Sequence, residues 1–287
     1  MSKNVSTTLN DKLNKLKEDL KTMDRVIIAF SGGVDSAFLL KAASQAGLSE
    51  ILAVTGMSES LPQEELSFAV ELAASLNIKH RTILTEELMD ANYSNNPPDR
   101  CYYCKKDLFG KLREIAEKEN FSFILDGTNA DDVHDWRPGR RAAIEEGVES
   151  PLLNAGLSKK EIRELSLRYG LSTWDKPATP CLSSRFPYGQ KITAEALKRV
   201  NKAESFIRKF GFRELRVRDH SETARLEVNP EDFRIFINDT VREKIVDFLK
   251  SIGYKNITLD LQGFRSGSAN EVLAAYKNRR GPGIQSK

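Results

Sequence analysis

The chain has 287 residues, of which 40% are hydrophobic and 30% charged, and its formal net charge is +3. This composition is typical of a globular protein and excludes a largely disordered one, while the length allows one large domain or two smaller ones. No apolar run approaches the ~20 residues that span a bilayer, and the polar N-terminus has no signal core, so we expect a cytoplasmic protein. A net charge of +3 does not require a nucleic-acid partner and is compatible with phosphate-bearing small molecules.

The first part of the chain alternates short apolar runs with helical patterns. Leucines at positions 9, 13, 16 and 20 predict an amphipathic leading helix, and apolar runs predict strands at residues 25–29, 51–55, 81–84 and 121–125. Helical patterns follow the first two of these strands. The alternation predicts an α/β fold with a parallel sheet covered on both faces, and a nucleotide at the carboxyl end of its first strand.

The motif Ser-Gly-Gly-Val-Asp-Ser at residues 31–36 lies between the first predicted strand and a predicted helix. Gly32 and Gly33 let the backbone approach a ligand closely, Ser31 and Ser36 offer hydroxyl donors, and the N–H groups that open the helix have no intrahelical partners. Together these groups favour a pyrophosphate pocket, although a tight turn without a ligand is the alternative. The motif resembles the PP-loop of ATP pyrophosphatases, which implies cleavage of ATP between its α and β phosphates.

Two cysteines, Cys101 and Cys104, open a helical pattern after an Asn- and Pro-rich loop at residues 95–100. A Cys-x-x-Cys pair at a helix start is typical of a redox dithiol or of half a metal site. Zinc has weak support, because the three histidines have no ligand-like spacing from another ligand.

Two further stretches contain groups suited to ATP chemistry. Asp131 and Asp132 follow the fourth predicted strand and could hold Mg²⁺ with the phosphates, the alternative being a solvated turn. Cys181 follows two prolines and precedes Arg185, whose guanidinium favours a thiolate over a thiol. We therefore predict that Cys181 is functional rather than a core cysteine.

The pattern changes near residue 192 to that of a small α+β unit, so we predict domains at residues 1–188 and 189–287. Its expected elements are a helix at 196–210, strands at 214–218 and 223–228 joined as a hairpin, helices at 233–237 and 241–252, and a strand at 257–261. Arg216, Arg218 and Glu227 alternate on the two hairpin strands, and a charged solvent-facing side of the sheet is one interpretation of them. Residues 281–287 are expected to fray.

Five segments together resemble one family. They are residues 31–36, 126–132, 137–139, 181–189 and 261–267, and the Cys-Leu-Ser-Ser-Arg-Phe-Pro-Tyr-Gly stretch at 181–189 is the most specific. The chain is similar over nearly its whole length to the LarE family, the ATP-dependent sulfur transferases of the nickel-pincer nucleotide pathway that serves lactate racemase. The resemblance implies adenylation of the carboxylates of pyridinium-3,5-biscarboxylic acid mononucleotide, followed by displacement of AMP by sulfur, which leaves thiocarboxylates.

The resemblance also assigns roles to residues. The catalytic groups it implies are Cys181, Asp35 and Arg185. ATP, with Mg²⁺, would contact Ser31, Gly32, Gly33, Asp35, Ser36, Met57, Gly127 and Asp131. The substrate and its phosphate would contact Glu204, Arg216, Arg218 and Glu227.

The cysteine count separates two branches of this family. In one, a single cysteine at the position of Cys181 gives up its own sulfur and the protein is consumed. This chain adds Cys101 and Cys104, and so resembles the branch in which three cysteines hold a 4Fe-4S cluster, leaving one iron open to bind hydrosulfide. We expect repeated turnover with sulfide or another sulfur donor, and the resemblance implies a trimer-based homo-oligomer.

Three other functions are open at this point. A tRNA-thiolating enzyme also combines a PP-loop with cysteines, but it would favour a more basic surface than +3 provides. An ammonia-using synthetase of the NAD or GMP type would leave Cys181 incidental. A nucleotide-binding regulator with redox-sensing cysteines would leave Asp131, Asp132 and Cys181 without a chemical task.

Overall fold

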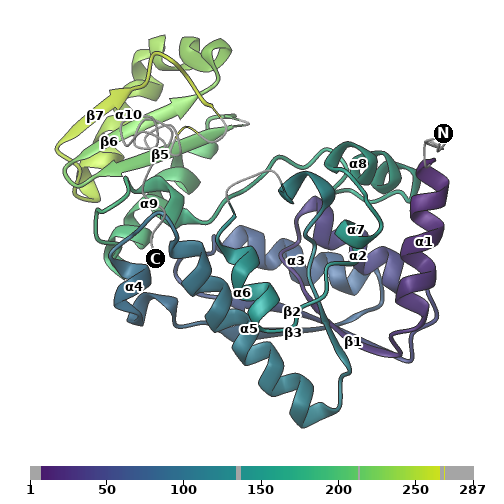
Figure 1. Cartoon of the computed structure of the whole chain (residues 1–287). Helices are drawn as coiled ribbons and strands as arrows, with labels where there is room; N and C mark the ends of the chain where they lie inside the picture. Colours follow the sequence, from purple (N-terminus) through teal and green to yellow (C-terminus); the bar gives the residue numbers. More distant parts are fainter. Residues whose placement is uncertain (1–7, 134–136, 213, 266–267, 269–287) are drawn as a thin grey trace, which may run out of the picture. The chain divides into compact units, whose positions relative to one another are not determined.

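The computed structural model describes residues 8–133, 137–212, 214–265 and 268 (Figure 1). These residues form two compact units. Unit 1 comprises the described parts of Met1–Asp90 and Asp99–Pro180, and unit 2 those of Ala91–Pro98 and Cys181–Lys287. The division at residues 188 and 189 stays a prediction about folding domains. Residues 281–287, where fraying was expected, lie outside the described residues.

Unit 1 contains a four-stranded parallel sheet in the order β3-β2-β1-β4, as predicted. Its strands are β1 (Arg25–Ala29), β2 (Glu50–Met57), β3 (Lys79–Leu84) and β4 (Phe123–Leu125). β2 is longer than expected because its last two residues, Gly56 and Met57, still pair with Ile83 and Leu84 of β3. β4 is shorter because only Val26, Ile27 and Ile28 of β1 lie opposite it.

Side chains of successive strand residues enter different cores, so helices cover both faces of this sheet, as Figure 1 shows. Val26 and Ile28 pack with α1 (Leu9–Lys21), α2 (Val34–Ser44), α3 (Gln63–Ser75), α7 (Pro151–Asn154) and α8 (Lys159–Arg168). Ile27 and Ala29 pack with α5 (Arg100–Glu119) and α6 (Gly139–Glu145). Two 3₁₀ segments, η1 (Glu87–Met89) and η2 (Ala130–Val133), complete unit 1.

Unit 2 is built on a three-stranded sheet in the order β5-β6-β7. β5 (Leu215–His220) and β6 (Thr223–Val228) form the predicted antiparallel hairpin, and β7 (Asn256–Leu259) lies parallel to β6. One face of the sheet packs on α9 (Ala194–Arg208) and α10 (Asp239–Ser251) through a shared apolar cluster. The remaining elements are α4 (Ala91–Ser94) and the 3₁₀ segments η3 (Leu182–Arg185) and η4 (Pro230–Ile237), the last of which was expected as an α-helix.

Within the described residues, no helix combines the length and the apolar character that a membrane crossing requires.

Candidate functional site

The PP-loop of unit 1 connects β1 to the first turn of α2. Gly32 has a φ of +68°, a conformation that favours glycine, and Gly33 is the N-cap of α2. Because glycine has no side chain, it leaves the opening N–H groups of α2 for another acceptor. The hydroxyls of Ser31 and Ser36 lie 3.1 Å apart, and Ser36 donates to the Gly33 carbonyl at 3.3 Å. These bonds are long, so an incoming phosphate can replace them at low cost.

Two close approaches fix the shape of this loop. A Cβ on Gly32 would lie 3.1 Å from the Cβ of Ala69 in α3. A Cβ on Gly127, which follows β4, would lie 2.9 Å from the backbone nitrogen of Ser36. Gly127 therefore lies against the first turn of α2, beside the predicted nucleotide contacts.

Lys159, which the sequence did not single out, contacts both Asp35 and Asp131. The ammonium of Lys159 lies 2.6 Å from one Asp35 carboxylate oxygen, and the Lys159 backbone N–H donates to Asp131 at 2.8 Å. The other Asp35 oxygen, Oδ1, is buried and has no hydrogen-bond partner among the described residues. Lys159 is the first residue of α8, whose predicted capping box between Ser158 and Glu161 is confirmed. The capping box allows the helix start to be predicted from the sequence. It does not indicate that Lys159 contacts Asp35 and Asp131.

Asp132 differs from its neighbour Asp131. It is buried, it pairs with Arg137 at 2.8 Å, and it accepts a hydrogen bond from the Asn129 N–H. Burial raises the pKa of Asp132, against the opposing effects of that hydrogen bond and of Arg137. The two adjacent acids thus bind different donors, and no three Cys, His, Asp or Glu side chains among the described residues are grouped so that they could hold a metal ion.

A second lysine missed by sequence reasoning contacts the PP-loop directly. The ammonium of Lys176 donates to the Gly32 carbonyl at 3.2 Å and pairs with Glu65 at 2.9 Å. Its only sequence signal is its position before Pro177, at the start of the unusual stretch that leads to Cys181. Met57, another predicted nucleotide contact, ends β2 and is partly exposed.

Cys101 and Cys104 lie at the start of α5, where side chains three residues apart share a helix face. Cys101 is exposed and Cys104 partly exposed. Two accessible thiols one turn apart fit two ligands of a cluster or metal. Cys181, the third predicted ligand, precedes η3 in unit 2 and is partly exposed.

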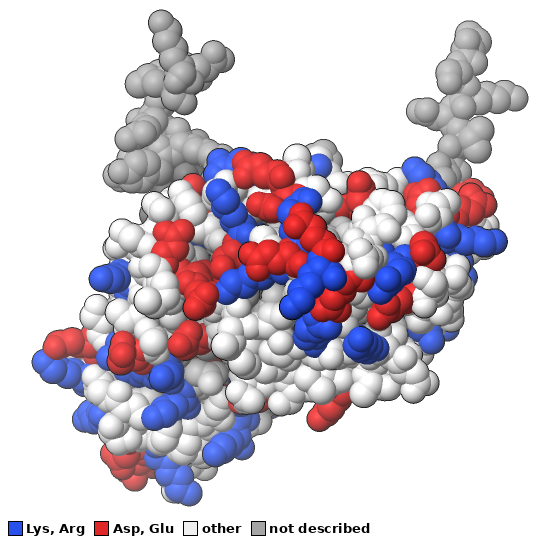
Figure 2. Space-filling view, turned by 90° about the horizontal axis from the view of Figure 1, so that it is seen from below, with Lys and Arg blue, Asp and Glu red and all other residues white. Residues whose placement is uncertain are grey.

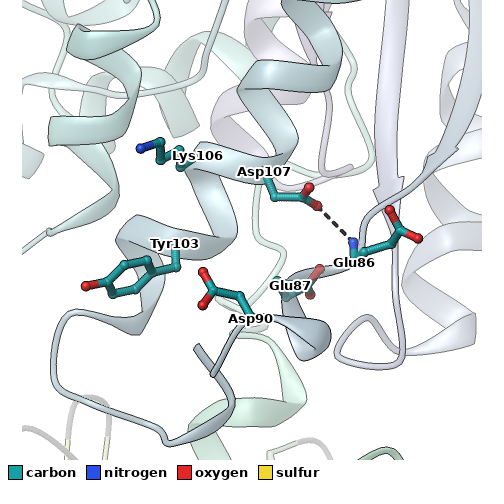
Figure 3. Close-up of a pocket in the computed structure, with 6 residues that line it drawn as sticks. All are labelled: Glu86, Glu87, Asp90, Tyr103, Lys106 and Asp107. Carbon is teal, nitrogen blue, oxygen red and sulfur yellow. Dashed lines mark hydrogen bonds between the residues drawn. The ribbon is translucent and has the colours of Figure 1, made fainter. Parts of the chain in front are cut away.

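A pocket of about 230 Å³ adjoins the same helix in unit 1 (Figure 3). It is lined by Glu86, Glu87, Asp90, Tyr103, Lys106 and Asp107. The lining thus has four acidic side chains and one lysine, which would repel phosphate. None of the predicted site residues lines it.

In unit 2, a buried ion pair supports the segment that begins at Cys181, called here the cysteine segment. Arg185 and Glu204 are buried and form two parallel hydrogen bonds of 2.8 and 2.9 Å. Burial opposes the charge of Arg185, but Glu204 outweighs it and raises the pKa of the guanidinium. Arg185 also donates to the Cys181 carbonyl at 3.1 Å, so it anchors the backbone of the cysteine segment. The guanidinium of Arg185 pairs with Glu204. A catalytic role for Arg185 stays a prediction.

Arg216 and Arg218 of β5 and Glu227 of β6 are buried, so these three residues do not form a solvent-facing side of the sheet. Arg216, Arg218 and Glu227 have exposed fractions of 6%, 4% and 1%. Arg218 pairs with Glu227 at 2.9 Å and donates to the Ser184 carbonyl at 2.6 Å. Glu204 accepts from Arg185, Arg208 and the Val217 N–H, so its carboxylate is already well occupied.

Arg216 is different from these neighbours. Among the described residues it has no hydrogen-bond or ion-pair partner, and its guanidinium lies 4.9 Å from the centre of the Phe264 ring. Burial and the positive charges of Arg185 and Arg218 lower the pKa of Arg216 to about 10. A buried guanidinium in this state is suited to a phosphate or carboxylate.

The surface charge agrees with the small net charge. Figure 2 shows Lys and Arg side chains interspersed with Asp and Glu over the face in view. A broad single-sign basic surface, as expected for RNA binding, is not seen on that face.

The chain matches known proteins over nearly its full length. It is 42% identical over 265 residues to an uncharacterized protein of Synechocystis sp., covering 92% of this chain and 99% of that protein. It is 40% identical over 271 residues to the pyridinium-3,5-bisthiocarboxylic acid mononucleotide synthase of Lactiplantibacillus plantarum, covering 93% and 96%. An uncharacterized protein of Methanocaldococcus jannaschii is 33% identical over 258 residues, covering 89% and 98%. No protein-family model matches the chain.

Proposed function

This chain belongs to the LarE family, and we propose that it is an ATP-dependent sulfur transferase that converts the carboxylates of pyridinium-3,5-biscarboxylic acid mononucleotide to thiocarboxylates. The observation that carries the proposal is the extent of the similarity to the named synthase, which covers 93% of this chain and therefore both units. A shared PP-loop alone would support only ATP use.

In the first step, a substrate carboxylate oxygen attacks the α-phosphorus of ATP, and the bond from that phosphorus to the bridging oxygen breaks. Pyrophosphate leaves, and the carboxylate becomes an acyl adenylate. The unpaired N–H groups at the start of α2 and the hydroxyls of Ser31 and Ser36 would bind the charge that develops on pyrophosphate. Lys159 adds a positive charge at Asp35.

Mg²⁺ would screen the phosphates, and Asp35 and Asp131 are the carboxylates we assign to it. The support for this choice is chemical. Asp35 has a buried carboxylate oxygen without a partner among the described residues, and one residue, Lys159, contacts both acids.

In the second step, sulfur attacks the acyl carbon and AMP leaves with the electrons of the broken carbon–oxygen bond. We assign Arg216 to an anionic group of the pyridinium nucleotide, because it is a buried guanidinium without a hydrogen-bond or ion-pair partner among the described residues. Arg218, Glu227 and Glu204 form the ion-pair network around it, and we assign them to the same substrate site through their effect on Arg216.

Cys101, Cys104 and Cys181 are the residues we assign to a 4Fe-4S cluster. Such a cluster on three thiolates leaves one iron able to hold hydrosulfide for transfer. The helix face shared by Cys101 and Cys104 supports two of the three ligands. Arg185 holds the backbone of the third, Cys181.

Pyrophosphate release tests the core of this proposal. With ATP, Mg²⁺ and the pyridinium biscarboxylate, the protein is expected to form AMP and pyrophosphate in amounts that depend on the substrate. Pyrophosphate formation that does not respond to the substrate, or none at all, would overturn it.

The cluster has its own test. Protein purified without oxygen is expected to contain about four irons and four sulfides per chain. Cys101→Ala is expected to lower the iron content while adenylation continues. An iron-free wild type that loses one sulfur from Cys181 after reaction would instead show sacrificial donation, the mode of the single-cysteine branch.

A further inference from the structure

Lys176 is a conspicuous side chain beside the PP-loop that the proposed chemistry has not used. It belongs to unit 1, its side chain has an exposed fraction of 16%, and its ammonium has three contacts. It donates to the Gly32 carbonyl at 3.2 Å, pairs with Glu65 at 2.9 Å, and lies 3.7 Å from the centre of the Phe68 ring. An ammonium has three N–H donors and no acceptor, so the carbonyl contact has a defined direction.

The contact with Gly32 fixes the orientation of one peptide group in the anion-binding loop. The Gly32 carbonyl and the Gly33 N–H belong to the same peptide, which is trans like the other described peptides, so they point in opposite directions. While Lys176 holds the carbonyl on the α3 side, the Gly33 N–H points to the other side, where it approaches Ser31 Oγ at 3.4 Å. That N–H is therefore available for a better acceptor, such as a phosphate oxygen.

This peptide needs an external support because its conformation is not strongly selected by the chain itself. Glycine adopts both signs of φ about equally, and Gly32 is at +68° with another glycine after it. The supports come from one face of α3. Glu65 and Phe68 hold the ammonium, and Ala69 packs where a Gly32 side chain would be.

We propose that Lys176 is a positioning residue for pyrophosphate binding, and that it acts by holding the Gly32–Gly33 peptide with its N–H directed at the phosphates. Glu65 keeps the ammonium in place and offsets part of its charge. The inference rests on the proposed use of ATP by the PP-loop, and it concerns the binding of pyrophosphate and the ATP phosphates rather than of adenosine or of the pyridinium substrate.

The test is a titration of the full chain with Mg²⁺ and inorganic pyrophosphate, ATP or adenosine, for the wild type and Lys176→Met. Losing one hydrogen bond to a charged donor predicts that pyrophosphate and ATP bind about 10- to 100-fold more weakly. Adenosine affinity is expected to be unchanged. In turnover assays, the KM for ATP rises by a similar factor, whereas kcat at saturating ATP changes less.

Lys12→Met is the matched control. Lys12 also belongs to unit 1, has a similar exposed fraction of 21%, and pairs with Glu161 at 2.8 Å. It separates loss of a lysine–glutamate pair from loss of the loop contact. Equal pyrophosphate affinities for Lys176→Met and Lys12→Met would overturn the inference.

Two more variants keep the test decisive if Lys176→Met does not fold. Lys176→Arg keeps a donor and is expected to recover part of the affinity. Glu65→Gln weakens the ion pair that holds the ammonium, so it is expected to bind pyrophosphate more weakly than the wild type. A Glu65→Gln affinity for pyrophosphate equal to that of Lys12→Met would contradict the positioning role. A wild type that binds adenosine, ATP and pyrophosphate at no measurable level would overturn the proposed function and this inference together.

Discussion

The PP-loop of unit 1 and the charged cluster of unit 2 offer anions different kinds of binding group. The charged cluster comprises the buried residues Arg185, Glu204, Arg216, Arg218 and Glu227. The PP-loop offers backbone N–H groups, and its own hydroxyl contacts are long, at 3.1 to 3.4 Å. The cluster offers side-chain charges that already bind one another tightly, as Arg185 and Glu204 do at 2.8 and 2.9 Å. Arg216 is the arginine there that has no hydrogen-bond or ion-pair partner among the described residues.

Because of this difference, we expect the two regions to be sensitive to different kinds of substitution. A backbone site depends on peptide orientation and on the absence of Cβ atoms, so it is sensitive to shape. A buried ion-pair network depends on balanced charges, and removing one partner leaves the other charge buried. Substitutions of each kind can therefore break or sharpen the comparison.

The largest effect is expected from Glu204→Gln. It leaves Arg185, a fully buried guanidinium, without its counterion, so the free energy of unfolding of unit 2 should fall by about 3–5 kcal/mol. Chemical denaturation measures this loss. The matched control is Glu164→Gln, whose partner Arg168 is half exposed, and its cost should stay below about 1 kcal/mol. Similar losses for both variants would contradict the description of the cluster as a tightly balanced network.

Gly127→Ala is the corresponding change at the PP-loop. The added Cβ would lie 2.9 Å from the Ser36 nitrogen and would displace the first turn of α2, so kcat/KM for ATP should fall about 100-fold. Steady-state kinetics at varied ATP measure it. Gly110→Ala is the control, because no atom lies within 4 Å of its added Cβ, and it should leave kcat/KM unchanged. An active Gly127→Ala enzyme would show that the loop adapts more easily than proposed.

Arg216→Met should change binding and stability in opposite directions. Substrate KM is expected to rise about 10- to 100-fold while ATP affinity is retained, because a charged hydrogen bond to the substrate is lost. Arg242→Met, at an exposed ion pair in the same unit, should change neither constant.

The stability effect follows from the pKa of Arg216. Its folded value of about 10 is below that of an ordinary arginine, so the charged form costs folding free energy at every pH below about 10. Removing the charge should therefore stabilise the substrate-free protein by about 1–2 kcal/mol at neutral pH, and this gain should shrink as the pH rises above about 10. Destabilisation at pH 7 would mean that Arg216 has a compensating partner.

The smallest effect is expected from Lys159→Met. The substitution removes the charge beside Asp35 but leaves the backbone donors of the loop, so the KM for ATP should rise about tenfold. Lys160→Met, at the next residue, serves as the control and should give the wild-type KM. If Lys159→Met lowered kcat/KM for ATP as much as Gly127→Ala does, side-chain charge rather than backbone shape would dominate this site.

The sequence predicted the PP-loop well because its signal is local. A β-branched run, two glycines and an apolar helix at residues 25–44 determine both the structure and the donors. The four parallel strands followed from the same alternation and are confirmed. Lys159 and Lys176 could not be predicted in this way, because their ammonium groups contact residues more than 100 positions earlier in the chain.

The cluster of unit 2 was harder for a related reason. The alternation of Arg216 and Arg218 in β5 predicts a strand, but it does not say what covers the charged side. In the structure, Ser184 and Ser268, from either side of the hairpin in the chain, supply acceptors for Arg218. Burial of these charges thus depends on distant segments, and only the family resemblance pointed to a site. The remaining predictions, a cytoplasmic location and a trimer-based assembly, stay predictions.

The amount of sulfur transferred per chain tests the central claim most directly. Protein purified without oxygen would be incubated with ATP, Mg²⁺, the pyridinium biscarboxylate and sulfide, and thiocarboxylate and intact protein would both be measured by mass spectrometry. The proposal predicts several thiocarboxylates per chain, matching amounts of AMP and pyrophosphate, and Cys181 with its sulfur retained. At most one thiocarboxylate per chain, with a matching loss of sulfur from Cys181, would contradict repeated transfer, and no thiocarboxylate would contradict the proposed function.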